Sequence, residues 1–222
     1  FGETAQLYHV KTWEEAMTEV ELGKADYAVI PIENSSAGAV SDNYDLLIRH
    51  DNVIVAETFL PVNHALLGLP GASIQDIQVV YSHPQALMQC SQYLNAHRDW
   101  KQISVENTAV SAKKVIEDQD IHQAAVASQV AGSLYGLSVL AQEINHNRDN
   151  TTRFIILARD KVYRKDAKKI SICFELPHKI GSLYNILGNF IYNGVNMVMI
   201  ESRPILGKNW EYRFFVDIEG NL

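Results

Sequence analysis

The feature that most constrains this chain is the alternation of short apolar segments with amphipathic segments over its first 158 residues. Each apolar segment is bounded by turn-forming residues, as buried strands are, and the segments between them have helical spacing. Strands alternating with helices are typical of an α/β fold with mostly parallel pairing. The expected strands span residues 1–10, 27–32, 52–62, 64–69, 78–82, 102–106, 124–128 and 152–159.

Several helix ends are marked by the residues that favour them. Thr12 with Glu15 three residues later predicts a capping box, and Gly23 suits the position just past the end of that helix. Pro84 occupies the favoured first position of another helix, expected over residues 84–97.

A charged run, "RDKVYRKDAKK" (residues 159–169), separates this region from a second, smaller one. A stretch so poor in apolar residues predicts a linker. Beyond it we expect a strand, a helix closed by Gly194 and two further strands, at residues 170–177, 180–194, 195–204 and 211–219. This βαββ order is the first part of a ferredoxin-like βαββαβ unit. The final helix and strand of such a unit would lie beyond Leu222, and the first residue is not Met, so we expect chain beyond both ends.

Composition excludes several functional classes. A formal net charge of −7 argues against a nucleic-acid surface, which needs a basic face. No apolar run approaches the length that crosses a membrane, and no signal peptide is visible. The two cysteines, Cys90 and Cys173, lie in apolar patterns and are expected to be reduced core residues of a cytoplasmic protein. Scattered histidines and the absence of a CxxC pair exclude a recognisable metal site.

Polar side chains gather where expected strands end. The largest group is "PIENSSAG" (residues 31–38), and further groups occur at Ser82–His83, Asn107–Thr108, Ser128–Gln129 and residues 151–153. Ligands of open α/β sheets bind beyond the carboxyl ends of the strands, where helix N-termini favour anions. Each smaller group alone fits an ordinary helix cap. "PIENSSAG" carries a carboxylate, an amide and two hydroxyls at one strand end, which favours a binding site for a small polar molecule over a merely solvated loop.

Taken in order, these motifs resemble the family of prephenate dehydratase with a C-terminal ACT regulatory domain. The matching stretches span nearly the whole chain: "ADYAVIPIENSSAGAV", "YSHPQALMQC", "NTAVSAKKV", "AAVASQVAGSLYGL", "NTTRFIIL", "GSLYNIL" and "ESRP". A Gly-Pro-rich segment that the family carries on its first strand is absent and would precede Phe1.

The resemblance implies loss of carbon dioxide and water from prephenate to give phenylpyruvate, with no cofactor and no metal. It implies that Thr152 hydrogen-bonds or protonates the departing hydroxyl, that Arg153 anchors a carboxylate, that Asn34 is a catalytic residue lining the substrate loop, and that Glu33 is an alternative acid. The implied substrate-binding residues are Ser35, Ser36, Ser82, His83, Gln85, Gln89, Thr151 and Phe154.

The resemblance also implies architecture and regulation. The catalytic domain, residues 1–158, would be two-lobed like type II periplasmic binding proteins, with lobe one at 1–60 plus 150–158, lobe two at 61–143 and the active site between them. After a linker at 159–168, the ACT domain at 169–222 would bind L-phenylalanine as a feedback inhibitor. A homodimer or homotetramer is implied. The implied effector-binding residues are Gly181, Ser182, Leu183, Glu201, Ser202, Arg203 and Pro204.

Three alternatives stay open from the sequence. Arogenate, the aminated analogue, could replace prephenate as the substrate. The same two lobes could form a non-catalytic small-molecule-binding module. A chorismate mutase domain could precede the visible chain.

Overall fold

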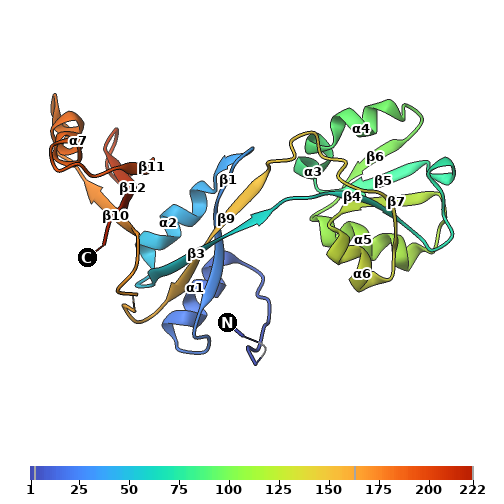
Figure 1. The fold of residues 1–222 in the computed structure, drawn as a ribbon, viewed down its shortest axis with the longest axis horizontal. Coiled ribbons are helices and arrows are strands. Elements are labelled where there is room, and N and C mark those ends of the chain that lie inside the picture. Colours follow the sequence, from blue (N-terminus) through green and yellow to red (C-terminus); the bar gives the residue numbers. More distant parts are fainter. Residues whose placement is uncertain (3, 163, 222) are drawn as a thin grey trace. The chain divides into compact units, whose positions relative to one another are not determined.

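The chain passes between two separate units twice, so the first unit is built from both ends of the sequence (Figure 1). The computed structural model describes residues 1–2, 4–162 and 164–221. Unit 1 contains Phe1–Phe59 and Thr152–Leu222, and unit 2 contains Leu60–Thr151. The two crossings fall near the ends of two long strands, β3 and β9.

Unit 1 contains a four-stranded sheet in which a strand from late in the sequence lies between two early ones. The order is β2-β1-β9-β3, and β1 runs antiparallel to both β2 and β9. The expected strand over residues 1–10 is wrong, since residues 5–10 are irregular. The elements are α1 (Trp13–Glu21), β1 (Ala28–Asn34), β2 (Gly38–Ala39), α2 (Ser41–Arg49), β3 (Val53–Pro61) and β9 (Thr151–Ala158).

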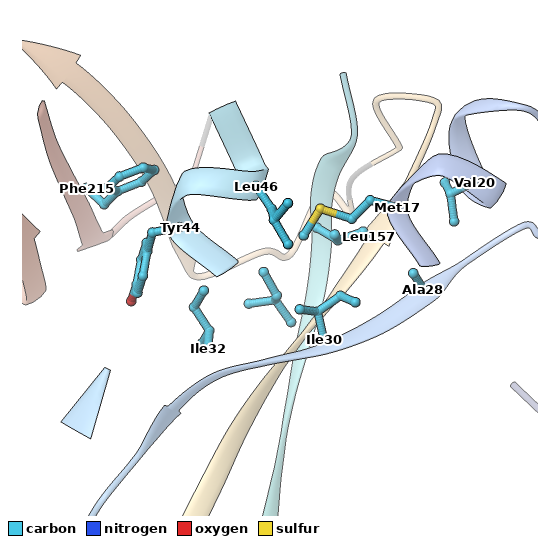
Figure 2. Packing of buried hydrophobic residues seen from close by; sticks show 10 residues of the cluster. Met17, Val20, Ala28, Ile30, Ile32, Tyr44, Leu46, Leu157 and Phe215 are labelled. Atoms are coloured by element: carbon cyan, nitrogen blue, oxygen red, sulfur yellow. The ribbon is translucent and has the colours of Figure 1, made fainter. Parts of the chain in front are cut away.

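One face of this sheet carries a buried apolar cluster, to which both helices contribute. Alternate residues of β1 point into it, as a strand covered on one face requires. In Figure 2 the side chains of Met17, Leu46 and Leu157 converge, and Tyr44 faces Phe215 from the small sheet of the same unit. The rings of Tyr44 and Phe215 lie 4.9 Å apart. Burying each such side chain contributes about 1.5–3 kcal/mol, so this cluster joins the two helices and the small sheet to β1 and β9.

The start of α1 is capped as the sequence predicts. The Oγ1 of Thr12 accepts a hydrogen bond from the Glu15 N–H at 3.1 Å. The carboxylate of Glu15 accepts from the Lys11 N–H rather than closing a box on Thr12. Gly23 has a φ of +68°, a left-handed conformation that glycine adopts without strain.

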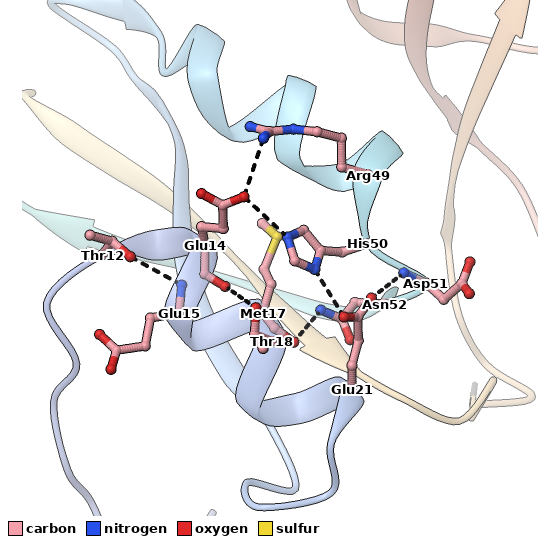
Figure 3. Close-up of polar contacts among 10 residues, drawn as sticks. All are labelled: Thr12, Glu14, Glu15, Met17, Thr18, Glu21, Arg49, His50, Asp51 and Asn52. Carbon is pink, nitrogen blue, oxygen red and sulfur yellow. Dashed lines mark hydrogen bonds and ion pairs between the residues drawn. The ribbon is translucent and has the colours of Figure 1, made fainter.

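Polar contacts hold α1 to the end of α2 (Figure 3). The Glu21 carboxylate lies 3.0 Å from His50 Nδ1 and accepts from the Asp51 N–H at 2.7 Å, and these two bonds lower the pKa of Glu21. Glu14 pairs with Arg49 at 3.2 Å. The Glu14–Arg49 pair is exposed and contributes little stability, whereas the His50–Glu21 contact is partly buried.

The small sheet of unit 1 has the βαββ order expected from the sequence. Its strand order is β10-β12-β11, antiparallel throughout. Cys173 is exposed on the edge strand β10, so its prediction as a core residue is wrong, while Cys90 is buried as expected and both cysteines are free. The elements are β10 (Lys169–Glu175), α7 (Ser182–Tyr192), β11 (Met197–Pro204) and β12 (Tyr212–Glu219).

Unit 2 contains a five-stranded mixed sheet in the order β6-β5-β7-β4-β8. Only β5 pairs in parallel, with β6 and β7, whereas β4 is antiparallel to β7 and β8. The expectation of mostly parallel pairing is therefore wrong in both units. Its elements are β4 (Ala65–Gly68), η1 (Ile74–Asp76), β5 (Val79–Ser82), α3 (Pro84–Gln89), α4 (Ser91–Ala96), β6 (Lys101–Ser104), α5 (Thr108–Asp118), β7 (Gln123–Ala127), α6 (Gln129–Tyr135) and β8 (Ser138–Ala141).

Two local expectations change in unit 2. The single helix predicted over residues 84–97 is two short helices that meet at Cys90, and β8 was not anticipated. None of the helices in the described parts of the chain is long and apolar enough to span a membrane.

Candidate functional site

The end of β1 and the start of β9 bring together residues that are far apart in the sequence. In the antiparallel register Asn34 lies opposite Thr152, and Glu33 lies opposite Arg153. The Asn34 Nδ2 donates a hydrogen bond to the Thr152 Oγ1 at 2.9 Å. This contact joins the "PIENSSAG" and "TTRF" motifs into one site.

The orientation of the Asn34 amide follows from its other partners. Its Oδ1 accepts hydrogen bonds from the backbone N–H groups of Ser36 and Ala37, at 3.0 and 2.9 Å. Since two N–H donors require the carbonyl oxygen, the amide nitrogen faces Thr152. The Thr152 oxygen is therefore the acceptor in this pair, so its hydroxyl hydrogen is directed away from the Asn34 amide. The amide thus both holds the turn after β1 and orients the threonine.

Arg153 points to the opposite face of the sheet from Thr152, because consecutive side chains of a strand alternate. Its Nε donates to Glu57 at 2.7 Å, its Nη2 donates to Asp217, and its Nη1 lies 3.9 Å from Glu33. Burial opposes the charge on the guanidinium, but the carboxylates of Asp217 and Glu57 outweigh it and raise the pKa of Arg153. Arg153, only 8% exposed, is already bound by acidic residues of its own chain.

Glu57 and Asp217 are site residues that the sequence reasoning missed. Glu57 also accepts from Lys169 Nζ at 2.6 Å, and Asp217 from Ser171 Oγ at 2.6 Å. Glu57 is the one acidic residue of β3, and Asp217 follows the apolar run 214–216 of β12. An acidic residue next to such apolar neighbours in a strand signals a partnered buried charge.

A cavity of about 440 Å³ lies on the Arg153 side of unit 1. Its walls come mainly from apolar residues of α2, β3, β9 and the small sheet, with Arg153, Lys169 and Asp217 among the polar ones. Neither Asn34 nor Thr152 lines it. The two predicted catalytic residues of "TTRF" thus face different surroundings.

The predicted substrate residues near the end of β1 and the start of β9 lie beside this pair. Ser35 and Ser36 occupy the turn after β1, which Asn34 holds. The hydroxyl of Thr151 donates to the Asp149 carbonyl at 3.3 Å, and Phe154 lies opposite Pro31 in the strand register.

The other predicted substrate residues lie in unit 2, at and just after the end of β5. Ser82 is fully buried and its hydroxyl donates to the Val126 carbonyl at 2.6 Å. His83 caps α3 by accepting from the Gln85 N–H at 3.2 Å. These hydrogen bonds give Ser82 and His83 structural roles in the strand-to-helix turn.

Gln89 has a buried partner that the sequence reasoning missed. The Nε2 of His64 lies 3.1 Å from the Gln89 Oε1, and burial lowers the pKa of His64. A neutral imidazole is therefore favoured beside the amide. Among the described residues, no three or more His, Cys, Asp or Glu side chains cluster so as to hold a metal.

A second hollow, of about 410 Å³, lies at the start of α7 in the small sheet. The predicted effector residues Ser182 and Leu183 line it together with Tyr212 and Phe214. Gly181, with a φ of +80°, turns the chain into α7 there.

The "ESRP" motif is divided between the two faces of β11. Ser202 lies opposite Phe214 in the register, so it shares the face on which the second hollow lies. Arg203 lies on the other face and forms a two-pronged ion pair with Asp45 of α2, at 3.1 and 2.6 Å. Glu201 shares that face by strand alternation, and Pro204 lies opposite Tyr212.

Comparison with known proteins gives a family match. The family model described as "Prephenate dehydratase" matches residues 1–162. The bifunctional chorismate mutase/prephenate dehydratase of Escherichia coli K12 is 40% identical over 206 residues, covering 92% of this chain and 53% of that protein. The arogenate dehydratase/prephenate dehydratase 1 of Arabidopsis thaliana is 41% identical over 226 residues, covering 95% of this chain and 57% of that protein. The chain therefore spans little more than half the length of these relatives.

Two solved structures resemble this chain closely, and the chain covers a larger share of their length than of the relatives above. The prephenate dehydratase of Arthrobacter aurescens in complex with L-Phe has a TM-score of 0.86 and 31% identity, covering 95% of this chain and 71% of that one. A protein described as GqqA, a quorum quenching acylase, also has a TM-score of 0.86 and 31% identity, covering 96% of this chain and 78% of that one.

Proposed function

The chain belongs to the prephenate dehydratase family, and we propose that it converts prephenate to phenylpyruvate. In this reaction the bond between the ring and its carboxylate breaks and releases carbon dioxide. Its electron pair enters the ring as the ring C–O bond breaks, and the departing hydroxide gains a proton to become water. Aromatisation drives both losses, so the protein needs only to orient the ring, hold two carboxylates and assist the proton.

The observation that carries the proposal is the Asn34–Thr152 hydrogen bond. Because Asn34 donates to the threonine oxygen, the threonine proton can be directed at the departing hydroxyl. A free threonine is a very weak acid, so we assign Thr152 to donating a hydrogen bond and relaying a proton.

The division of Thr152 and Arg153 between two faces changes the role we propose for Arg153. Its guanidinium is bound by Glu57 and Asp217, so it is proposed to support the strand rather than to anchor substrate. Substrate carboxylates would instead meet small donors, which include Ser35 and Ser36 after β1.

The proposed catalytic architecture is the two-lobed type II periplasmic-binding-protein-like fold. The chain crossings at Phe59/Leu60 and Thr151/Thr152 support lobes close to 1–60 plus 150–158 and 61–143.

The direct test is to incubate the purified chain with prephenate at neutral pH and to follow phenylpyruvate by its alkaline absorbance. We expect phenylpyruvate well above the uncatalysed rate. Arogenate is assayed in parallel because the Arabidopsis relative carries both names. Turnover of arogenate alone would replace prephenate as the substrate. Turnover of neither would favour a binding module, or an acylase as named for GqqA, and would overturn the proposal.

We propose that the small sheet is the ACT domain (residues 169–222) and that L-phenylalanine inhibits the enzyme by binding there. Its βαββ order supports this, as does the L-Phe bound to the Arthrobacter protein. The second hollow, with Ser182, Leu183 and Phe214, would receive the effector. A homodimer or homotetramer in the cytoplasm completes the proposal.

Ser202→Ala is expected to weaken inhibition by L-phenylalanine about fivefold, because losing one hydrogen bond costs about 1 kcal/mol and 1.4 kcal/mol is tenfold in affinity. Turnover without effector should be unchanged. Inhibition curves for the variant and for Ser133→Ala, an exposed serine of α6, provide the measurement and its control. Equal inhibition in all three proteins would remove Ser202 from the effector site.

A further inference from the structure

We propose that Asp217, a residue of the small sheet, is a positioning residue for the reaction at Thr152. It acts through Arg153, which it holds against the strand that carries both Arg153 and Thr152. The inference rests on the proposed dehydratase function and extends it to a residue outside the 1–162 region that the family model covers.

The contacts form a linked set of charges in which Asp217 and Arg153 are buried and Glu57 and Lys169 are partly exposed. Asp217 is 2% exposed, and its two carboxylate oxygens accept from Arg153 Nη2 and from Ser171 Oγ. Arg153 also donates to Glu57 of β3, and Glu57 in turn accepts a hydrogen bond from Lys169. A buried charge without its partner is strongly unfavourable, so this set has one preferred geometry.

That geometry bears on Thr152 because Thr152 and Arg153 are consecutive in β9. Side chains of consecutive strand residues project to opposite faces, so a rotation of the strand at Arg153 swings Thr152 away from Asn34. The pairing of β9 with β1 is irregular at this level, since its register shifts between Pro31 and Glu33. The chain also re-enters unit 1 at Thr152. The bound guanidinium therefore determines the direction of the Thr152 hydroxyl.

The small sheet contacts the other half of the pair as well. Arg203 binds Asp45 of α2, and Tyr44 of the same helix packs on Phe215. Helix α2 begins at Ser41, shortly after the turn that Asn34 holds. The small sheet is thus linked to both sides of the Asn34–Thr152 hydrogen bond.

The experiment compares Asp217→Asn with the unmodified chain. The amide has nearly the same shape but cannot neutralise Arg153. We expect kcat for phenylpyruvate formation to fall about 100-fold, the cost of a displacement of about 1 Å at a reacting group, with KM changed less than about threefold. Hydrogen exchange should also be faster, by about tenfold, in the peptide covering residues 151–154.

Two further variants distinguish a specific loss of Thr152 positioning from a general disturbance of the small sheet. Glu175→Gln removes an exposed carboxylate that pairs with Arg213 in the same small sheet, and it should leave kcat and exchange at 151–154 unchanged. Asp217→Glu keeps the charge and should recover part of the lost kcat. If Asp217→Asn does not fold, Ser171→Ala removes only the hydroxyl that holds Asp217 and should give a smaller effect of the same kind.

Hydrogen exchange at residues 151–154 is measured without substrate. The proposed dehydratase function and the positioning role of Asp217 can therefore fail separately. If the unmodified chain turns over neither prephenate nor arogenate, the proposed function fails and the role of Asp217 in catalysis fails with it, whatever exchange shows about β9. If the chain is active but Asp217→Asn keeps both its kcat and its exchange at 151–154, the positioning role is overturned and the proposed function stands. A fall in kcat with unchanged exchange also overturns positioning through the strand.

Discussion

Thr152→Ala is expected to lower kcat for phenylpyruvate formation about 10³-fold, within the range for loss of a positioned proton-transfer group. The change deletes the hydroxyl that Asn34 orients, while the backbone pairing of β1 with β9 is retained. Because Thr152 lies at a strand end and is only partly buried, the folded fraction should not change. Steady-state kinetics with prephenate, together with far-UV circular dichroism, provide the measurement.

Two companion variants sharpen this result. Thr152→Ser keeps a hydroxyl on the same carbon and should retain a substantial part of kcat. Thr58→Ala removes an exposed threonine from β3 of the same sheet and should behave as the unmodified protein. A Thr152→Ala protein with near-normal kcat would exclude the hydroxyl from the mechanism.

Arg153→Met is expected to reduce the free energy of unfolding of unit 1 by about 3–5 kcal/mol, the cost of removing one partner from a buried ionic group. Methionine fills much of the space but leaves Glu57 and Asp217 close together without a cation between them. Urea unfolding followed by circular dichroism measures the loss, with the transitions of the two units analysed separately.

The stability result separates two roles for Arg153. A residue that anchors a substrate carboxylate would give a stable variant with a raised KM, and that outcome would contradict the structural role. The control is Arg213→Met, since Arg213 pairs with the exposed Glu175 and such pairs contribute about 0–1 kcal/mol. Adding Asp217→Leu to Arg153→Met should restore part of the stability, because it removes one of the unpaired carboxylates.

Local sequence patterns were enough to predict most helices and strands and the polar groups at their ends. Helical and strand periods are local properties, so the alternation over residues 13–158 and the βαββ order beyond it were predictable. The cap at Thr12 and the turn at Gly23 follow from side chains that act within a few residues. The crowding of small polar groups in "PIENSSAG" marked the turn that Asn34 holds.

Strand partners, strand directions and the surroundings of each side chain depend on contacts between distant segments, so they became known from the folded chain. β1 pairs with β9, more than a hundred residues away, and local periodicity carries no information on such a partner or its direction. Hence the mostly parallel sheet was wrong, and Cys173 proved exposed on an edge strand. "TTRF" suggested two neighbouring groups serving one substrate. Strand alternation sends them to opposite faces, and the carboxylates that receive Arg153 come from β3 and β12, whose proximity exists only in the folded chain.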